Sequence, residues 1–254
     1  MGLRRRTVVG DLALLRRTLA ATFETYAAEV IARREKCIVA LPGGSVATAF
    51  FPTLAASAVD WARVEMFWID ERAVPPDHPD SNYAVASRLL LMPARVPLAR
   101  IHRMPGELTE LEQAARRAAD ELKSIAGDPP HLDLALVGVG DDGHVASIFA
   151  SGMGVRGNSS AETRGVAAPP PVVPVYDSPK PPPRRLTMAL SVLADAGLLV
   201  VAALGASKAE AIKAALEGAG STTPLARLLR SSADSLVLLD SEAGALIRPG
   251  DWLS

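Results

Sequence analysis

The residues best suited to chemistry lie in the stretch Asp133–Ala150, DLALVGVGDDGHVASIFA, where an aliphatic run gives way to a glycine turn. Asp142 and His144 stand two residues apart there, and we expect a short helix to begin at the histidine. A helix N-terminus disfavours an imidazolium and a nearby carboxylate favours it, so His144 can change charge near neutral pH. No G-x-S-x-G motif and no Cys/His cluster accompanies it. We therefore predict that His144 activates water as a general base, without a metal.

Other stretches carry groups that could bind an anion. Gly43–Ser45 separates a strand-like run from a helical one, so N–H groups at the helix start could face a ligand, although an ordinary turn capped by Ser45 is the simpler interpretation. Lys180, Arg184 and Arg185 stand among prolines, either in a basic surface loop or as cations held rigidly for a phosphate. Lys208 begins a helix, where it opposes the helix dipole unless it shares an anionic ligand.

The stretch WIDERAVPPDHPDSNY places charged and polar residues directly after an apolar run. Asp70 and Arg72 follow the predicted strand, and a charged group at that point also fits a solvated loop. Ser81 and Asn82 are expected to cap the next helix, and they could bind hydroxyl groups of a ligand.

Continuous aliphatic runs alternate with helical periodicity along the chain, which predicts a mostly parallel sheet covered by helices on both faces. The predicted strands are CIVALP, VEMFWID, LDLALVGVG, LLVVAALG and SLVLLD. Ligands of such sheets bind beyond the carboxyl ends of the strands, so we expect the stretches described above to share one edge. We interpret the Gly- and Pro-rich segment 151–183, with its possible strand VVPVYD, as a loop within one domain that covers residues 1–254.

The amino-acid composition limits which classes of binding partner and which cellular location the sequence predicts. The formal net charge of the 254 residues is −1, so bulk charge attracts neither nucleic acid nor an anionic membrane. The single cysteine, Cys37, cannot form an intramolecular disulfide and is expected to be buried, which favours a cytoplasmic location. Asp11 interrupts a signal-like N-terminus, and Asp195 and Gly197 interrupt the longest apolar region, so we predict no membrane segment.

Three stretches in this order, DERAVPPDHPDSNY, GVGDDGHVASIF and SPKPPPRRLT, resemble the 6-phosphogluconolactonase family, and GGS and GASKAEAI add support. That family shares a superfamily with the glucosamine-6-phosphate deaminases. The resemblance runs from about Cys37 to near the C-terminus. It implies a Rossmann-like three-layer α/β/α fold, no cofactor, and hydrolysis of 6-phospho-D-glucono-1,5-lactone to 6-phospho-D-gluconate in the oxidative pentose phosphate pathway. A monomer and a small homo-oligomer both remain open.

The resemblance also implies roles for individual residues. His144 is the general base, Asp142 orients it or the substrate, and backbone N–H groups near the glycine turn could stabilise the oxyanion. The implied substrate and phosphate contacts are Gly43, Gly44, Ser45, Asp70, Arg72, Asn82, Lys180, Arg185 and Lys208. Val46 and Ala47 depart from the usual Thr-Pro of the family loop.

Two alternatives remain on the same fold. A deaminase-isomerase would carry a glutamate five residues after the histidine and a tyrosine after the Asp-Glu pair, where this chain has Phe149 and Arg72. A non-catalytic sugar-phosphate-binding regulator would bind without turnover, and the presence of both Asp142 and His144 counts against it.

Overall fold

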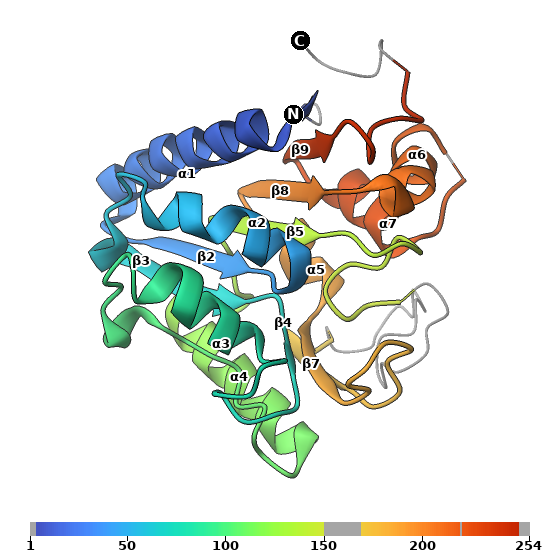
Figure 1. Cartoon of the computed structure of the whole chain (residues 1–254). Helices are drawn as coiled ribbons and strands as arrows, with labels where there is room; N and C mark the ends of the chain where they lie inside the picture. Colours follow the sequence, from blue (N-terminus) through green and yellow to red (C-terminus); the bar gives the residue numbers. More distant parts are fainter. Residues whose placement is uncertain (1–3, 150–168, 219, 249–254) are drawn as a thin grey trace.

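The computed structural model describes residues 4–149, 169–218 and 220–248, and it is built around a six-stranded parallel sheet (Figure 1). The strand order is β1-β9-β8-β5-β2-β3. The bounds are β1 Arg4–Gly10, β2 Cys37–Leu41, β3 Val64–Trp68, β5 Leu134–Gly138, β8 Leu198–Ala203 and β9 Asp234–Asp240. Every residue of β2, β3 and β8 is buried, which explains why these strands are apolar in the sequence, with Glu65 of β3 as the exception.

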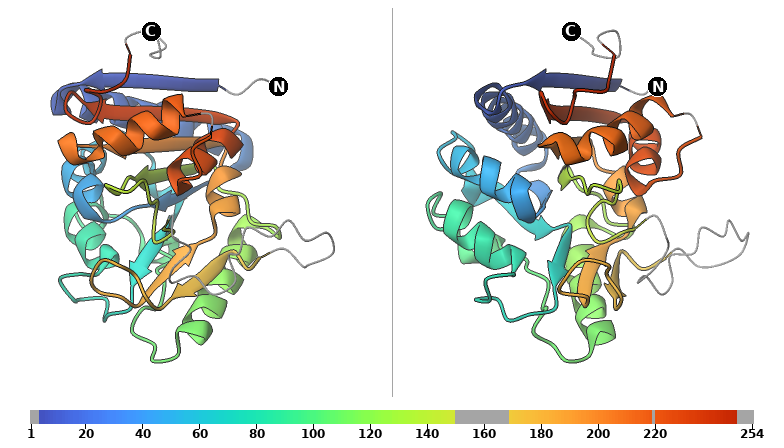
Figure 2. Two further views of the ribbon diagram at one scale, coloured as in Figure 1. Left: turned by 90° about the vertical axis from the view of Figure 1, so that its right-hand side faces the viewer. Right: turned by 45° about the vertical axis from the view of Figure 1, so that its right-hand side comes forward.

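Helices cover both faces of this sheet, and each face has its own hydrophobic cluster (Figures 1 and 2). One face carries α1 Leu12–Arg34, α2 Gly44–Ala55 and α3 Asn82–Ala86, which continues into a π-helical turn, Ser87–Leu91. The other carries α4 Leu111–Ala126, α5 Leu190–Ala194, α6 Ala209–Glu217 and α7 Pro224–Ser231. Short 3-10 helices lie at Trp61–Arg63, Leu98–Arg100 and Ala206–Lys208. The predicted three-layer α/β/α fold with a mostly parallel sheet is therefore confirmed.

A second, antiparallel sheet of three strands lies beside the carboxyl end of β3. Its strands are β4 Asp70–Arg72, β6 Val172–Val175 and β7 Arg185–Met188, in the order β4-β7-β6. The β4–β7 register pairs Arg72 with Arg185 and Asp70 with Thr187. This pairing joins two of the motifs singled out in the sequence, although they are far apart along the chain.

Several local predictions were wrong. The N-terminal arginines lie in β1 at the edge of the sheet, a strand that the polar sequence concealed, and β7 was also missed. Residues 141–149 form turns and no helix begins at His144, because Gly143 and Ala146 have φ of 78° and 51°. The cap of α2 is Gly43, which makes no side-chain hydrogen bond, and Ser45 lies inside the helix.

Other expectations were met. Cys37 is fully buried, and burial raises the pKa of its thiol to about 12. Among the described residues, no helix has the length and apolar character needed to cross a bilayer. The possible strand VVPVYD corresponds to β6, whereas residues 150–168 of the predicted loop lie outside the described residues. The assignment of residues 1–254 to one domain stays a prediction.

Candidate active site

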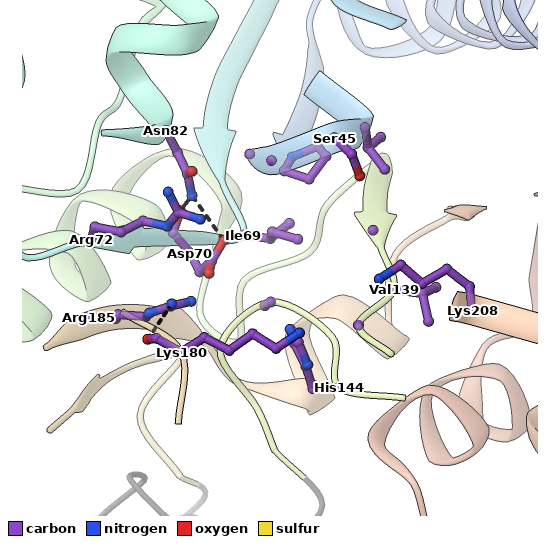
Figure 3. A pocket seen from close by; sticks show the side chains of 17 residues that line it. Ser45, Ile69, Asp70, Arg72, Asn82, Val139, His144, Lys180, Arg185 and Lys208 are labelled. Carbon is purple, nitrogen blue, oxygen red and sulfur yellow. Dashed lines mark hydrogen bonds between the residues drawn. The ribbon is translucent and has the colours of Figure 1, made fainter. Parts of the chain in front are cut away.

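A cleft of about 240 Å³ opens beyond the carboxyl ends of β2, β5 and β8, where parallel sheets place their ligands (Figure 3). The predicted site residues that line it are Gly43, Gly44, Ser45, Asp70, Arg72, Asn82, His144, Lys180, Arg185 and Lys208. Asp142 is the one predicted residue outside this lining, and it contacts the cleft through His144.

His144, the predicted base, makes a short hydrogen bond with the carboxylate of Asp142. His144 Nδ1 lies 2.5 Å from Asp142 Oδ1, and the backbone N–H of His144 donates to the same oxygen at 3.2 Å. Partial burial raises the pKa of Asp142, but the hydrogen bonds from His144 outweigh it and the net pKa is lowered. The carboxylate is therefore ionised at pH 7 and accepts the Nδ1 proton. That tautomer leaves the Nε2 lone pair available as a base.

The environment of the imidazole keeps it neutral. Burial lowers the pKa of His144 below its ordinary value, against the opposing effect of Asp142, and the nearby charge of Lys180 lowers it further. The His144 ring packs against the Phe149 ring, with 4.6 Å between centroids. The ring also lies close to Gly140, where an added Cβ would come within 1.9 Å of Nδ1. The site therefore holds a neutral, closely packed imidazole.

Opposite His144 lies a set of buried side chains that we call the buried network: Asp70, Asn82, Ser147 and Arg185. Ser147 Oγ donates to Asp70 Oδ2 at 2.6 Å and accepts from Arg185 Nη1 at 3.2 Å. Asn82 Nδ2 donates to the other Asp70 oxygen at 3.1 Å and to its carbonyl at 2.9 Å. Each of the four is at most 6% exposed. These hydrogen bonds therefore hold Asp70 between Asn82, at the start of α3, and Ser147, in the turn after β5.

Most N–H groups of Arg185 donate hydrogen bonds to acceptors within the protein. Nε donates to the Pro182 carbonyl, Nη2 to those of Lys180 and Pro181, and Nη1 to Ser147. Four of the five N–H groups of a guanidinium are thus already used. Arg185 therefore anchors the proline-rich loop that carries Lys180, and it offers a ligand its charge and one remaining donor.

Glu71 organises the side of the cleft that carries Asn82, and it was not among the predicted site residues. Its carboxylate accepts from the backbone N–H groups of Arg72, Asn82 and Tyr83 at 2.7–2.8 Å and from Ser81 Oγ at 3.0 Å. These bonds attach the end of β4 to the start of α3. They place Asn82 against Gly43, where any Cβ would come within 1.7 Å of Asn82 Oδ1.

The first turn of α2 presents backbone N–H groups to the cleft. Gly43 caps the helix without a side-chain hydrogen bond, and Gly44 has φ of 65° and an open space where a Cβ would be. Ser45 is exposed, whereas Val46 and Ala47 are buried in the core. The two positions that depart from the family loop therefore pack inward, and the backbone remains free to approach an anion.

A second set of residues, which we call the ion-paired cluster, comprises Asp141, Asp142, His144, Lys180 and Lys208. Asp141, which the sequence analysis did not assign, contacts Lys208 Nζ and lies 3.6 Å from Lys180 Nζ. Burial lowers the pKa of Lys208. Lys180 extends toward His144 (Figure 3). Local sequence carries no signal for these pairs, because their members lie on different loops.

Part of the glycine turn is already occupied by its own hydrogen bonds, and the expected role of this turn in stabilising an oxyanion stays a prediction. The backbone N–H groups of Gly140, Gly143, His144 and Val145 already donate to acceptors within the turn. These four N–H groups are therefore not available to a ligand while the turn keeps this geometry. No group of three His, Cys, Asp or Glu side chains that could hold a metal ion occurs within the described ranges.

Comparison with known proteins gives a consistent result. Residues 10–238 match the family model described as glucosamine-6-phosphate isomerases/6-phosphogluconolactonase. The 6-phosphogluconolactonase of Mycobacterium leprae is 34% identical, and the match covers 96% of each chain. That of Streptomyces coelicolor is also 34% identical, over 92% of this chain and 91% of its own. The solved 6-phosphogluconolactonase of Trypanosoma cruzi has a TM-score of 0.80 at 22% identity, covering 96% of this chain and 97% of that one, which shows the shared fold.

Proposed function

Because the chain belongs to the glucosamine-6-phosphate isomerase/6-phosphogluconolactonase family, we propose that it hydrolyses 6-phospho-D-glucono-1,5-lactone to 6-phospho-D-gluconate, a step of the oxidative pentose phosphate pathway. The observation that carries the proposal is a neutral imidazole, His144, in a cleft that four cationic side chains also line. The cations suit a phosphate, which carries a charge of about −1.5 to −2 at pH 7. The imidazole suits the activation of water.

In the proposed reaction His144 Nε2 accepts a proton from a water molecule as the water oxygen bonds to the lactone carbonyl carbon. Asp142 stabilises the resulting imidazolium through Nδ1. The tetrahedral oxyanion then collapses, the bond from this carbon to the ring oxygen breaks, and the imidazolium returns the proton to that oxygen. The product is the open-chain acid, which ionises at neutral pH. The free donors of Arg72 and Arg185 are our candidates for stabilising the oxyanion.

For the phosphate we propose the first turn of α2 together with Lys180 and Lys208. Backbone N–H groups at the start of a twelve-residue helix and two ammonium groups provide complementary charge. Asp70 and Asn82 are then left to orient the hydroxyl groups of the sugar. No cofactor enters this scheme.

The environment of His144 favours this reaction over a deaminase-isomerase. The side chain five residues after the histidine is Phe149, whose ring packs on the imidazole. A deaminase of the family would have a carboxylate at this position, and a phenyl ring cannot transfer protons. Packing of an apolar ring instead keeps His144 neutral and able to activate water.

The test is a direct assay of lactone consumption by the intact chain, monitored as acid release and corrected for unaided hydrolysis. We expect enzyme-dependent hydrolysis of the phosphorylated lactone, a much lower kcat/KM for glucono-1,5-lactone without phosphate, and no ammonia from glucosamine 6-phosphate. Ammonia release would support the deaminase, and binding of 6-phosphogluconate without hydrolysis would support the regulator. We also propose that the reaction takes place in the cytoplasm, in keeping with a single, buried cysteine.

A further inference from the structure

Asp141 bridges two lysines that come from different parts of the chain. Lys180 lies in the proline-rich loop before β7, and Lys208 lies in the 3-10 turn after β8. Asp141 Oδ1 contacts Lys208 Nζ and lies 3.4 Å from Ser207 Oγ, while Oδ2 lies 3.6 Å from Lys180 Nζ. A single carboxylate therefore holds both ammonium groups at the cleft.

The neighbouring residues Asp141 and Asp142 of this turn contact different partners. Asp142 bonds to His144, and Asp141 bonds to no part of the imidazole. The side chains of Asp141 and Lys180 are 54% and 44% exposed, so these two charges can separate into water without the cost of burying an unpaired charge. The side chain of Lys208 is only 16% exposed, so Asp141 can leave it only when another anion takes its place. The pairs of Asp141 are therefore exchangeable, unlike the bonds of the buried network.

We propose that Asp141 is a positioning residue that occupies Lys180 and Lys208 in the free protein and is displaced from them by the phosphate of the substrate. The inference rests on the function proposed above and names the group that the phosphate replaces. A phosphate offers three acceptor oxygens and a charge of about −1.5 to −2, whereas a carboxylate offers two oxygens and one charge. The phosphate therefore competes successfully, and the displaced carboxylate limits how tightly it is held.

The effect of removing the Asp141 charge has a definite sign. Asp141→Asn keeps the size of the side chain but removes both the competitor for the lysines and the repulsion of the incoming anion. Exposed ion pairs are individually weak, so we expect the Kd for inorganic phosphate to fall by about three- to tenfold. The KM for the lactone should fall in parallel, while kcat should not rise, because Asp141 makes no contact with His144.

The experiment is a calorimetric titration of the intact chain with inorganic phosphate at one fixed, low ionic strength. The proteins are the wild type, Asp141→Asn, Asp141→Glu and Asp195→Asn. Asp141→Glu restores the charge and should return the Kd toward the wild-type value. Asp195→Asn is the matched control: its side chain is 68% exposed, it pairs with His131 outside the cleft, and its loss changes the net charge equally. It should leave the Kd unchanged.

A Kd for Asp141→Asn that equals or exceeds the wild-type value would overturn the inference. So would equal tightening by Asp195→Asn, which would indicate a general charge effect, or an absence of phosphate binding to both wild type and Asp141→Asn. Thermal unfolding of each variant checks that the fold is intact. If the wild type hydrolyses the lactone and phosphate binding is not tightened, only the inference fails. If phosphate binding is tightened but no lactone is hydrolysed, only the proposed function fails.

Discussion

The buried network and the ion-paired cluster both contribute side chains to the cleft, and they are constructed differently. Members of the buried network are at most 6% exposed and are held by hydrogen bonds to backbone and side chains. In the ion-paired cluster the side chains of Asp141 and Lys180 are 54% and 44% exposed and form an ion pair, whereas those of Lys208 and His144 are 16% and 13% exposed. Buried bonds specify one geometry, whereas exposed pairs can exchange partners. The buried network therefore fixes the shape of the cleft, and we expect the exposed pair of the ion-paired cluster to exchange partners when a substrate binds.

The largest expected effect is at His144, the proposed base, which belongs to the ion-paired cluster. His144→Ala should lower kcat/KM for the lactone by about 10²–10⁴-fold, because no other described residue is placed to accept the proton from water in the same way. Steady-state hydrolysis, corrected for the unaided reaction, measures this loss. His78→Ala, in an exposed loop outside the cleft, is the control and should be nearly neutral. Equal activity of His144→Ala and wild type would remove His144 from the mechanism.

The next effect tests the buried network, through Arg185. Arg185→Lys keeps the charge but cannot reproduce the four bonds of the guanidinium, so loop carbonyls lose their donors. We expect a loss of about 2–4 kcal/mol in the free energy of unfolding and a raised KM. Denaturant unfolding measures the change in the free energy of unfolding, and steady-state kinetics measure the change in KM. Arg184→Lys changes an exposed neighbour whose guanidinium donates to the Thr109 carbonyl, and it should change stability by less than about 1 kcal/mol. Similar losses in both variants would contradict the anchoring role.

A smaller change is expected when the carboxylate of Asp142, which hydrogen-bonds to His144, is removed. In the wild type, kcat/KM should fall as the pH drops through the pKa of His144, which lies below about 6.5 because burial disfavours the imidazolium. Asp142 raises that pKa. Asp142→Asn should therefore shift the acid limb to still lower pH and reduce kcat by about tenfold. A pH–rate profile measures both effects, and a shift to higher pH would show that Asp142 does not stabilise the imidazolium.

The smallest effect concerns one hydroxyl of the buried network. Ser147→Ala leaves Asp70 Oδ2 and Arg185 Nη1 without their shared partner. We expect a loss of about 1–2 kcal/mol in stability and a rise of a few-fold in KM with little change in kcat. Ser124→Ala, at an exposed hydroxyl on α4, is the matched control. If kcat fell and KM stayed constant, Ser147 would have to act on the chemical step instead.

The comparison also explains what the sequence could predict. Residues at the carboxyl ends of parallel strands converge, so the stretches around Gly43, Asp70 and His144 could be assigned to one edge. Pairings between distant segments could not: β7 reaches β4 from far along the chain, and Asp141 meets its lysines from two other loops. The helix expected at His144 failed because positive φ angles nearby have no clear signal at an alanine. The polar residues of β1 concealed an edge strand.

The close approach of the His144 ring to Gly140 has a consequence for how this active site can vary. Even a methyl group at position 140 would overlap the imidazole, so the backbone there is restricted as tightly as the base it supports. A residue that contributes no functional group is therefore a steric requirement for the position of the imidazole. The hydrogen atom of Gly140 leaves the volume that the ring occupies, and any larger substituent would have to displace the ring or the turn.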